Sequence, residues 1–320
     1  MARVIVTGAA GFIGSQLVDR LIQQGHTVVG IDNFVRGREE NLASASTSER
    51  FSFVRADLAD MEAVTAGLAP VLAAGTFDWV WHFAANSDIP SGVADPSIDL
   101  RDTFLTTFNV LKLMHGHAIK AIAFASTSAI YGVKPGRIRE DAGPLFPISN
   151  YGAMKLASEA IIGAAMESFL DRAVIFRFPN VVGSRGTHGI IFDLLQKLKL
   201  RPPSLEVLGD GTQCKPYLHV SELLDALFFI QKTAPEPLAC YNIGPLDDGA
   251  TVGFIAAAVL RAAGATIPLR YTGGDRGWVG DVPRFQYSTD KLGELGWEPR
   301  LSSQAAVEKA CDEVARENGF

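Results

Sequence analysis

Residues 4–14 read VIVTGAAGFIG, a short apolar run that passes directly into a turn with three glycines. The run predicts a buried strand, and the spacing of Ile13, Leu17 and Leu21 predicts one apolar face of a helix after the turn. Glycines between a strand and a helix let the backbone approach a pyrophosphate, which the helix N-terminus stabilises. The stretch therefore predicts a dinucleotide-binding α/β fold. The cofactor contacts expected from it are Gly8, Gly11, Phe12, Ile13 and Gly14.

The second expected strand, residues 27–31, is followed directly by an acidic residue. Asp32 stands 18 residues after Gly14, where a carboxylate is placed to bind ribose hydroxyls. Such a carboxylate repels a 2′-phosphate and favours NAD over NADP, whereas Arg36 and Arg38 would accommodate that phosphate. A plain turn residue is the other interpretation of Asp32. The sequence therefore favours NAD without excluding NADP.

The first half of the chain alternates short apolar runs with helical patterns. Strands are expected at residues 3–7, 27–31, 51–55, 77–83, 121–126 and 173–177. Strands that are apolar throughout and separated by helices predict a parallel sheet covered on both faces. Beyond residue 178 glycine, proline and loop signals become denser. We therefore expect a doubly wound, Rossmann-like sheet over residues 1–178 and a smaller C-terminal α/β substrate domain over 179–320, with a segment near 217–245 that could return to the main sheet.

The bulk composition narrows the class of protein. The chain has 320 residues and a formal net charge of −6, which argues against nucleic acid or an anionic membrane as the main partner. Its three cysteines are widely spaced and show neither a disulfide framework nor a metal-ligand spacing. No apolar run approaches the roughly 20 residues that cross a bilayer. A cytoplasmic protein without a metal site is expected.

A tyrosine and a lysine stand four residues apart in YGAMK, residues 151–155. On a helix this spacing places Tyr151 and Lys155 on one face, one turn apart. A phenol titrates near pH 10, but a nearby ammonium and a cationic nicotinamide ring favour the phenolate. Tyr151 could then take the proton from a sugar hydroxyl while hydride leaves for the cofactor. The alternative is a surface pair without function.

Several segments, taken in order, resemble the extended short-chain dehydrogenase/reductase family, and within it the nucleotide-sugar epimerases and dehydratases. They are GAAGFIG (8–14), the strand end at Asp32, HFAA (82–85), STSAIYG (126–132), YGAMK (151–155), RFPNVVG (177–183) and GDGTQCKPYLHV (209–220). The resemblance implies a firmly held NAD that is used as a recycled oxidant. It also implies that Thr127 hydrogen-bonds the reacting hydroxyl, that Tyr151 is the base, and that Lys155 binds the nicotinamide ribose.

The resemblance extends to the remaining cofactor and substrate contacts. For the cofactor it adds Asn33, Asp57, Leu58, Phe83, Ala84 and Ala85, with Asp57 near the adenine or, alternatively, in a solvated turn. For a UDP-sugar substrate it implies contacts from Asn86, Ser87, Asn180, His188, Val207, Lys215, Arg276 and Asp281. Lys215 stands where an arginine is usual, and a lysine offers a point charge rather than a bidentate fork. A homodimer built on helices near residues 104–114 and 156–166 is implied as well.

Two positions after Thr127 bear on the reaction. In the family's 4,6-dehydratases they carry an aspartate and a glutamate, which serve as acid and base, but here they are Ser128 and Ala129. A 4-epimerase needs no such pair, so 4-epimerisation is expected first. A 5,6-dehydratase acting on UDP-GlcNAc and leaving an exocyclic alkene is the alternative within the family. A non-catalytic NAD-binding sensor is the alternative outside enzymes, although it would need neither Tyr151 nor Lys155.

Overall fold

The computed structural model describes residues 1–274 and 285–320, which form two compact units. The first unit comprises residues 1–130, 147–177 and 234–240. The second unit comprises residues 131–146, 178–233 and 241–320. Each unit is described by itself below.

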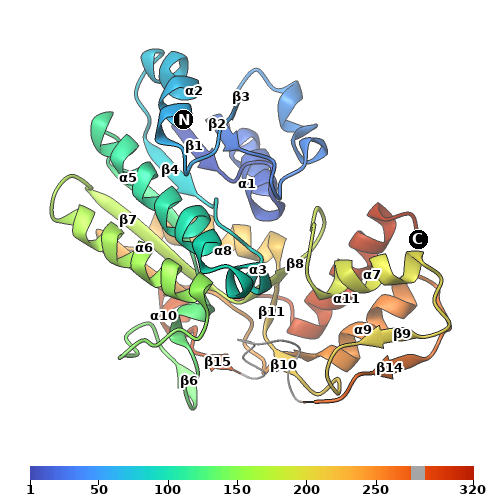
Figure 1. Cartoon of the computed structure of the whole chain (residues 1–320). Helices are drawn as coiled ribbons and strands as arrows, with labels where there is room; N and C mark the ends of the chain where they lie inside the picture. Colours follow the sequence, from blue (N-terminus) through green and yellow to red (C-terminus); the bar gives the residue numbers. More distant parts are fainter. Residues whose placement is uncertain (275–284) are drawn as a thin grey trace. The chain divides into compact units, whose positions relative to one another are not determined.

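The first unit is built on a seven-stranded sheet (Figure 1). Its strands, in spatial order, are β12 (Leu238–Asn242), β7 (Arg172–Phe178), β5 (Ala121–Thr127), β4 (Trp79–His82), β1 (Arg3–Thr7), β2 (Thr27–Asp32) and β3 (Phe51–Arg55). β1 pairs in parallel with both β2 and β4, and the chain reverses its direction across the sheet at this point. This arrangement confirms the expected doubly wound fold and makes the carboxyl end of β1 its topological switch point.

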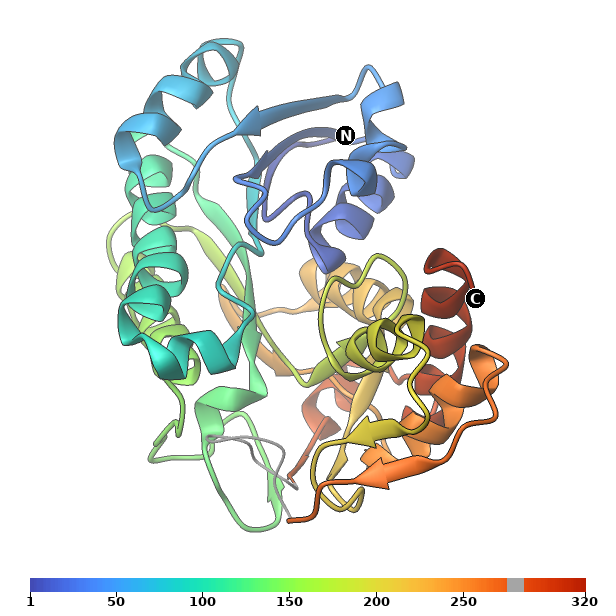
Figure 2. The same cartoon turned by 45° about the vertical axis from the view of Figure 1, so that its right-hand side comes forward.

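Four long helices cover the sheet. They are α1 (Phe12–Gln23), α2 (Met61–Ala73), α5 (Thr106–Gly116) and α6 (Asn150–Met166). In Figure 2, α2, α5 and α6 lie along one face of the sheet and α1 lies on the other, as right-handed crossovers require. Ser149 caps α6 by accepting a hydrogen bond from the Gly152 amide. The cap starts this helix at Asn150, so Tyr151 belongs to its first turn.

The strands form one apolar core with these helices. Ile5, Ile122 and Phe124 are fully buried, and they pack in one cluster with Met114 of α5 and Ile162 of α6. Burial of a large aliphatic or aromatic side chain contributes about 1.5–3 kcal/mol. The core therefore holds the carboxyl ends of β1, β4 and β5, where the predicted site residues lie, in fixed positions.

The second unit combines helices with short strand pairs. Its helices are α7 (Ile190–Lys199), α8 (Val220–Thr233), α9 (Val252–Ala262), α10 (Asp290–Leu295) and α11 (Ser303–Glu317). Its strand pairs are β8 (Asn180–Val182) with β11 (Tyr217–His219), β9 (Leu205–Val207) with β14 (Leu269–Tyr271), β10 (Cys214–Lys215) with β13 (Ala250–Thr251), and β6 (Arg137–Ile138) with β15 (Gln286–Tyr287). α7, α9 and α11 enclose a separate apolar core.

The units are not contiguous in sequence. The segment near 217–245 that could return to the main sheet does so through β12 (Leu238–Asn242), whereas a place for residues 131–146 in the second unit was not expected. Residues 131–146 join the second unit because β6 pairs with β15 and the Asn242 amide donates to Glu140. Residues 234–240 join the first unit, where β12 extends the sheet beside β7. Such long-range pairings leave no mark in local composition. Within the described residues, no helix is long and apolar enough to cross a membrane.

Candidate active site

The glycine turn after β1 is built for close approach of the backbone. Gly8 has φ +69°, and a Cβ there would stand 2.9 Å from the Ala84 amide nitrogen. A Cβ on Gly14 would stand 1.9 Å from the Gly8 carbonyl oxygen. Gly11 is the N-cap of α1, and no side chain caps this end of the helix. The first amides of α1 are therefore left to bind an anion such as a pyrophosphate.

Thr7 organises the same end of the sheet and was missed from the sequence. Its hydroxyl accepts hydrogen bonds from the amides of Phe83 (3.1 Å) and Ala84 (3.2 Å). It also bonds His82 Nδ1 at 2.7 Å. Burial, together with the charge of Lys155, lowers the pKa of His82 to about 3. His82 is therefore a neutral packed histidine, and a hydroxyl at the end of VIVT was the one available signal for this network.

Asp32 ties β2 to the glycine turn. Its carboxylate accepts hydrogen bonds from the Ala10 amide (2.9 Å) and the Phe34 amide (2.8 Å). Burial raises the pKa of Asp32, and these backbone bonds oppose the rise. Asn33 accepts a bond from the Val35 amide at 3.0 Å. A carboxylate can accept about four hydrogen bonds. The two backbone bonds to Asp32 therefore leave lone pairs on its carboxylate for the ribose hydroxyls.

The other charged candidates near the cofactor residues are paired. Arg36 forms an ion pair with Asp88, so its guanidinium is engaged by a carboxylate. Asp57, expected near the adenine, forms an ion pair with Arg101 and accepts a bond from the Ala59 amide. Leu58 is buried in the core beside it. The structure therefore brings the residues expected to contact the cofactor to one edge of the sheet. Two ion pairs that each contain an arginine, Arg36–Asp88 and Arg101–Asp57, lie there as well.

Tyr151, in the first turn of α6, lies near Thr127 at the end of β5, close enough for the Thr127 hydroxyl to lower the pKa of the phenol. Lys155, one turn further along α6, is buried at 2% exposure, and its Nζ donates to the Ala125 carbonyl at 2.6 Å. The same Nζ lies 4.6 Å from the centroid of the Phe124 ring and 6.0 Å from that of Tyr151. The helix spacing expected from YGAMK thus places the three residues together.

Burial dominates the pKa values of Tyr151 and Lys155. It raises the pKa of Tyr151 to about 12, with an opposing effect of the Thr127 hydroxyl and a further rise from Asp99. It lowers the pKa of Lys155 to about 7 against the charges of Glu159 and Asp99, which raise it. The sequence led us to expect that the ammonium and a cationic nicotinamide together favour the phenolate, and the bound nicotinamide would supply the larger part of that positive charge.

A buried ion pair between Glu159 and Arg177 lies near Lys155, and the charge of Glu159 raises the pKa of this lysine. Arg177 of β7 donates to Glu159 through Nε (3.0 Å) and Nη2 (2.6 Å), and Ser126 also hydrogen-bonds this carboxylate. Both charged side chains are more than 90% buried. Ser126, near the end of β5, thereby joins the strand to this ion pair. Ser128 and Ala129 follow in a short 3₁₀ turn, η4 (Ser128–Tyr131).

Asn86, expected to face the sugar, has its carboxamide engaged within the protein. Its Nδ2 donates to the Asp88 carbonyl (3.0 Å) and to Asp99 Oδ1 (2.9 Å), and its Oδ1 accepts from the Asp88 amide (2.9 Å). Thr103 adds a bond to Asp99 at 3.3 Å. Ser87 is exposed beside Asn86. Asp99, at the end of α4 (Pro96–Asp99), was not anticipated because a lone aspartate in a polar stretch carries no pattern.

The predicted substrate residues of the second unit are dispersed among different environments. Asn180 is exposed on β8, and His188 is exposed in the loop before α7. Val207 is buried at 1% in the core, so only its backbone is available to a ligand. Lys215 lies half-buried on β10. Arg276 and Asp281 lie outside the described residues.

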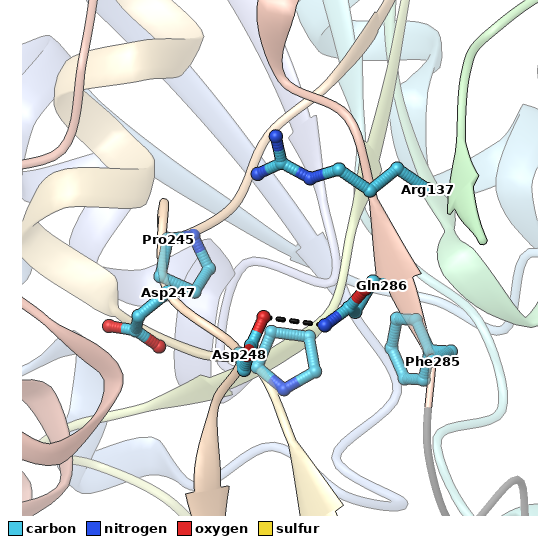
Figure 3. Close-up of a pocket in the computed structure, with 7 residues that line it drawn as sticks. Arg137, Pro245, Asp247, Asp248, Phe285 and Gln286 are labelled. Carbon is cyan, nitrogen blue, oxygen red and sulfur yellow. Dashed lines mark hydrogen bonds between the residues drawn. The ribbon is translucent and has the colours of Figure 1, made fainter.

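A pocket in the second unit contains charged groups of both signs (Figure 3). It is lined by Arg137, Pro216, Pro245, Asp247, Asp248, Phe285 and Gln286. Asp247 accepts bonds from the amides of Gly249 and Ser303, and Asp248 accepts one from Gln286. Arg137 makes no ion pair with any residue that the structure describes. Of the predicted substrate residues that the structure describes, none lines this pocket.

Comparisons with known proteins agree with the geometry. The family described as NAD dependent epimerase/dehydratase matches residues 4–244. UDP-glucose 4-epimerase of Mycolicibacterium smegmatis is 30% identical over 318 residues, covering 97% of each chain. A crystal structure of UDP-galactose 4-epimerase is 33% identical with a TM-score of 0.85, covering 98% of this chain and 99% of that one. DesIV, a dTDP-glucose 4,6-dehydratase from Streptomyces venezuelae, is 25% identical with a TM-score of 0.85, covering 99% of this chain and 97% of that one.

Proposed function

Because the chain belongs to the NAD-dependent epimerase/dehydratase family, we propose that it transiently oxidises the 4-hydroxyl of a UDP-hexose or UDP-N-acetylhexosamine, with 4-epimerisation as the net reaction. The observation that carries the proposal is the Thr127–Tyr151–Lys155 arrangement. The names of the relatives support the choice of a UDP-sugar.

The residues of the first unit fit the cofactor. The uncapped end of α1 suits the pyrophosphate, and Asp32 keeps lone pairs for the ribose. Burial of Lys155 beside β5 places its ammonium where the nicotinamide ribose is expected. When bound, NAD supplies the acceptor, and later the donor, of the hydride at carbon 4 of the sugar.

The protein's own groups handle the proton. Tyr151 accepts the proton of the 4-hydroxyl and returns it when the alcohol is formed again, so it acts as general base and then as general acid. Thr127, whose hydroxyl lies near Tyr151, orients the 4-hydroxyl of the sugar. Lys155, whose Nζ lies 6.0 Å from the centroid of the Tyr151 ring, stabilises the phenolate through space rather than by a direct bond.

The residues after Thr127 favour epimerisation over 4,6-dehydration. Ser128 offers one weak hydroxyl and Ala129 a methyl group, so neither supplies the carboxyl pair that removes water in the 4,6-dehydratases. Epimerisation requires only that the 4-keto sugar turn over and be reduced on its other face. A 5,6-elimination giving an exocyclic alkene would need an acid and a base elsewhere.

We further propose that the UDP moiety is bound by Asn180, His188, Lys215, the Val207 backbone, Arg276 and Asp281 of the second unit. We also propose a cytoplasmic homodimer that pairs α5 and α6. The exposed Phe108 on α5, 49% accessible, supports such a contact. A monomer by light scattering at micromolar concentration would contradict the dimer.

Product analysis with a panel of UDP-sugars tests the function. An epimerase returns UDP-glucose or UDP-GlcNAc as an isomer of unchanged mass, whereas either elimination removes the mass of one water. Calorimetric titration with the same sugars addresses the remaining alternative, because a non-catalytic NAD-binding sensor should not bind them. A dehydrated product would exclude net epimerisation and require an acid–base pair outside residues 126–132.

A further inference from the structure

Asp99 is an unusual carboxylate within the first unit. Its side chain is fully buried, and its Oδ1 accepts bonds from Asn86 Nδ2 (2.9 Å) and Thr103 Oγ1 (3.3 Å). Its Oδ2 is buried without a hydrogen-bond partner among residues 1–274 and 285–320. This oxygen lies against Gly92, where an added Cβ would stand only 1.8 Å away. A buried, half-satisfied carboxylate is costly, so its retention calls for a compensating role.

The hydrogen bonds favour the ionised form of Asp99. Both donors, Asn86 Nδ2 and Thr103 Oγ1, point at the carboxylate. A protonated Asp99 with its hydrogen on Oδ2 would need an acceptor there, and the described residues provide none. Burial and the charges of Asp102 and Asp88 raise the pKa of Asp99 above its usual range, and these two bonds oppose the rise. Its negative charge is therefore not neutralised by a contacting cation and acts on the groups around it.

The cation that this charge reaches is Lys155. α4 and the π-helical turn η3 (Leu100–Leu105) both pack against α6, which carries Tyr151 and Lys155. Asp99 interacts electrostatically with both side chains. The titratable groups that face Asp99, Tyr151 or Lys155 from the surrounding elements are Asp88, Asp102, Glu159 and the neutral His82.

From this placement we propose that Asp99 is a positioning residue of the active site: it is the through-space counter-ion of Lys155 and the anchor of Asn86. The proposal rests on the proposed function for its kinetic consequences. Asp99 is buried and does not touch substrate. It keeps the ammonium of Lys155 in its buried setting and holds the Asn86–Asp88 turn in one conformation.

The sign of the effect follows from the charge. A negative charge raises the pKa values of both Tyr151 and Lys155, so its removal lowers both. Asp99→Asn keeps the shape and removes the charge. The bell-shaped kcat/KM profile should then move toward lower pH on both limbs, by about one unit, because Tyr151 ionises earlier and Lys155 loses its proton earlier.

The matched control is Asp102→Asn. Asp102 lies three residues further on, partly exposed and paired with Arg101, and no direct bond joins it to Asn86. The Asp102→Asn variant should leave both limbs of the kcat/KM profile in place. Thr103→Val, which removes one donor to Asp99 and keeps its carboxyl group, should move both limbs in the same direction by less, and it serves if Asp99→Asn does not fold.

A readout without substrate separates this proposal from the proposed function. The near-ultraviolet absorbance of tyrosinate is titrated in NAD-loaded protein with and without Asp99→Asn, and the same proteins carrying Tyr151→Phe give the background. An earlier Tyr151 titration in Asp99→Asn, even in a protein that turns over no UDP-sugar, supports the role of Asp99 and rejects only the function. The proposal would be overturned if Asp99→Asn left the Tyr151 titration and both limbs of the kcat/KM profile in place and lowered the activity by the same factor at every pH. Asp99 would then be a merely structural carboxylate.

Discussion

Lys155 Nζ lies 6.0 Å from the centroid of the Tyr151 ring and donates its 2.6 Å hydrogen bond to the Ala125 carbonyl instead. The lysine is thus fixed to β5, and the tyrosine lies near Thr127 of the same strand. The two α6 residues that we propose as catalytic are therefore held at the end of one buried strand. In the proposed mechanism this geometry separates their roles, since Lys155 contributes charge and Tyr151 handles the proton.

Tyr151→Phe should lower turnover by about 10²–10⁴-fold, because it removes the proton acceptor and little volume. Binding of a UDP-sugar and of NAD, measured by calorimetry, should change little. Tyr271→Phe, at an exposed tyrosine on β14, is the matched control and should keep wild-type turnover. Full activity in Tyr151→Phe would remove this residue from the mechanism.

The Arg36–Asp88 ion pair predicts how cofactor choice can be altered. While Asp88 engages Arg36, this guanidinium is not free for a 2′-phosphate. Asp88→Asn should release it and increase the affinity for NADP relative to NAD, measured by fluorescence titration. Adding Arg36→Gln to the same protein should abolish the gain. An unchanged NADP affinity in Asp88→Asn would show that Arg36 does not reach the phosphate.

The Glu159–Arg177 pair predicts a large stability effect. Glu159→Gln leaves Arg177 charged, more than 90% buried and partly unpaired, which should cost about 3–5 kcal/mol in the free energy of unfolding. Asp171→Asn breaks an exposed pair with Lys120 and should cost little. Urea unfolding of both variants tests the contrast. Equal costs would mean that the buried pair is not a structural support of Lys155.

Much of this site could be predicted from the sequence, because most of its residues belong to short local patterns. Gly8, Gly14, Asp32, Tyr151 and Lys155 belong to patterns whose spacing fixes a turn or a helix face. Thr7 and Asp99 could not be predicted, because their importance comes from partners on other elements.

The limits of the domain prediction have the same physical origin. The noncontiguous units depend on pairings such as β6 with β15, more than a hundred residues apart in the chain, which composition does not record. The pKa of Tyr151 has the same kind of origin: helix spacing predicts that Lys155 is near, but not how deeply the phenol is buried, and burial is what raises its pKa.

Glu313 predicts a stability change in acid. Burial opposes its ionisation, yet the bond and charge of His219, together with Lys309, lower the pKa of Glu313 to about 2 from 4.5. A carboxyl whose pKa is lower in the folded state adds stability above pH 4.5 that is lost as the pH falls toward 2. Glu313→Gln should therefore flatten the decline in urea midpoint over this range.

Glu308→Gln removes an exposed carboxylate of the same helix, α11, and controls for the loss of one charge. If the decline in acid is as steep in Glu313→Gln as in wild type, the His219–Glu313 contact is not its source.

Reversible oxidation at carbon 4 by a recycled cofactor is tested most directly with a UDP-sugar that carries deuterium on carbon 4. We expect a 4-epimer of unchanged mass that retains the deuterium at carbon 4, and no labelled product in Tyr151→Phe. Loss of the deuterium to solvent, or a product that has kept its configuration at carbon 4 and lost water, would contradict it.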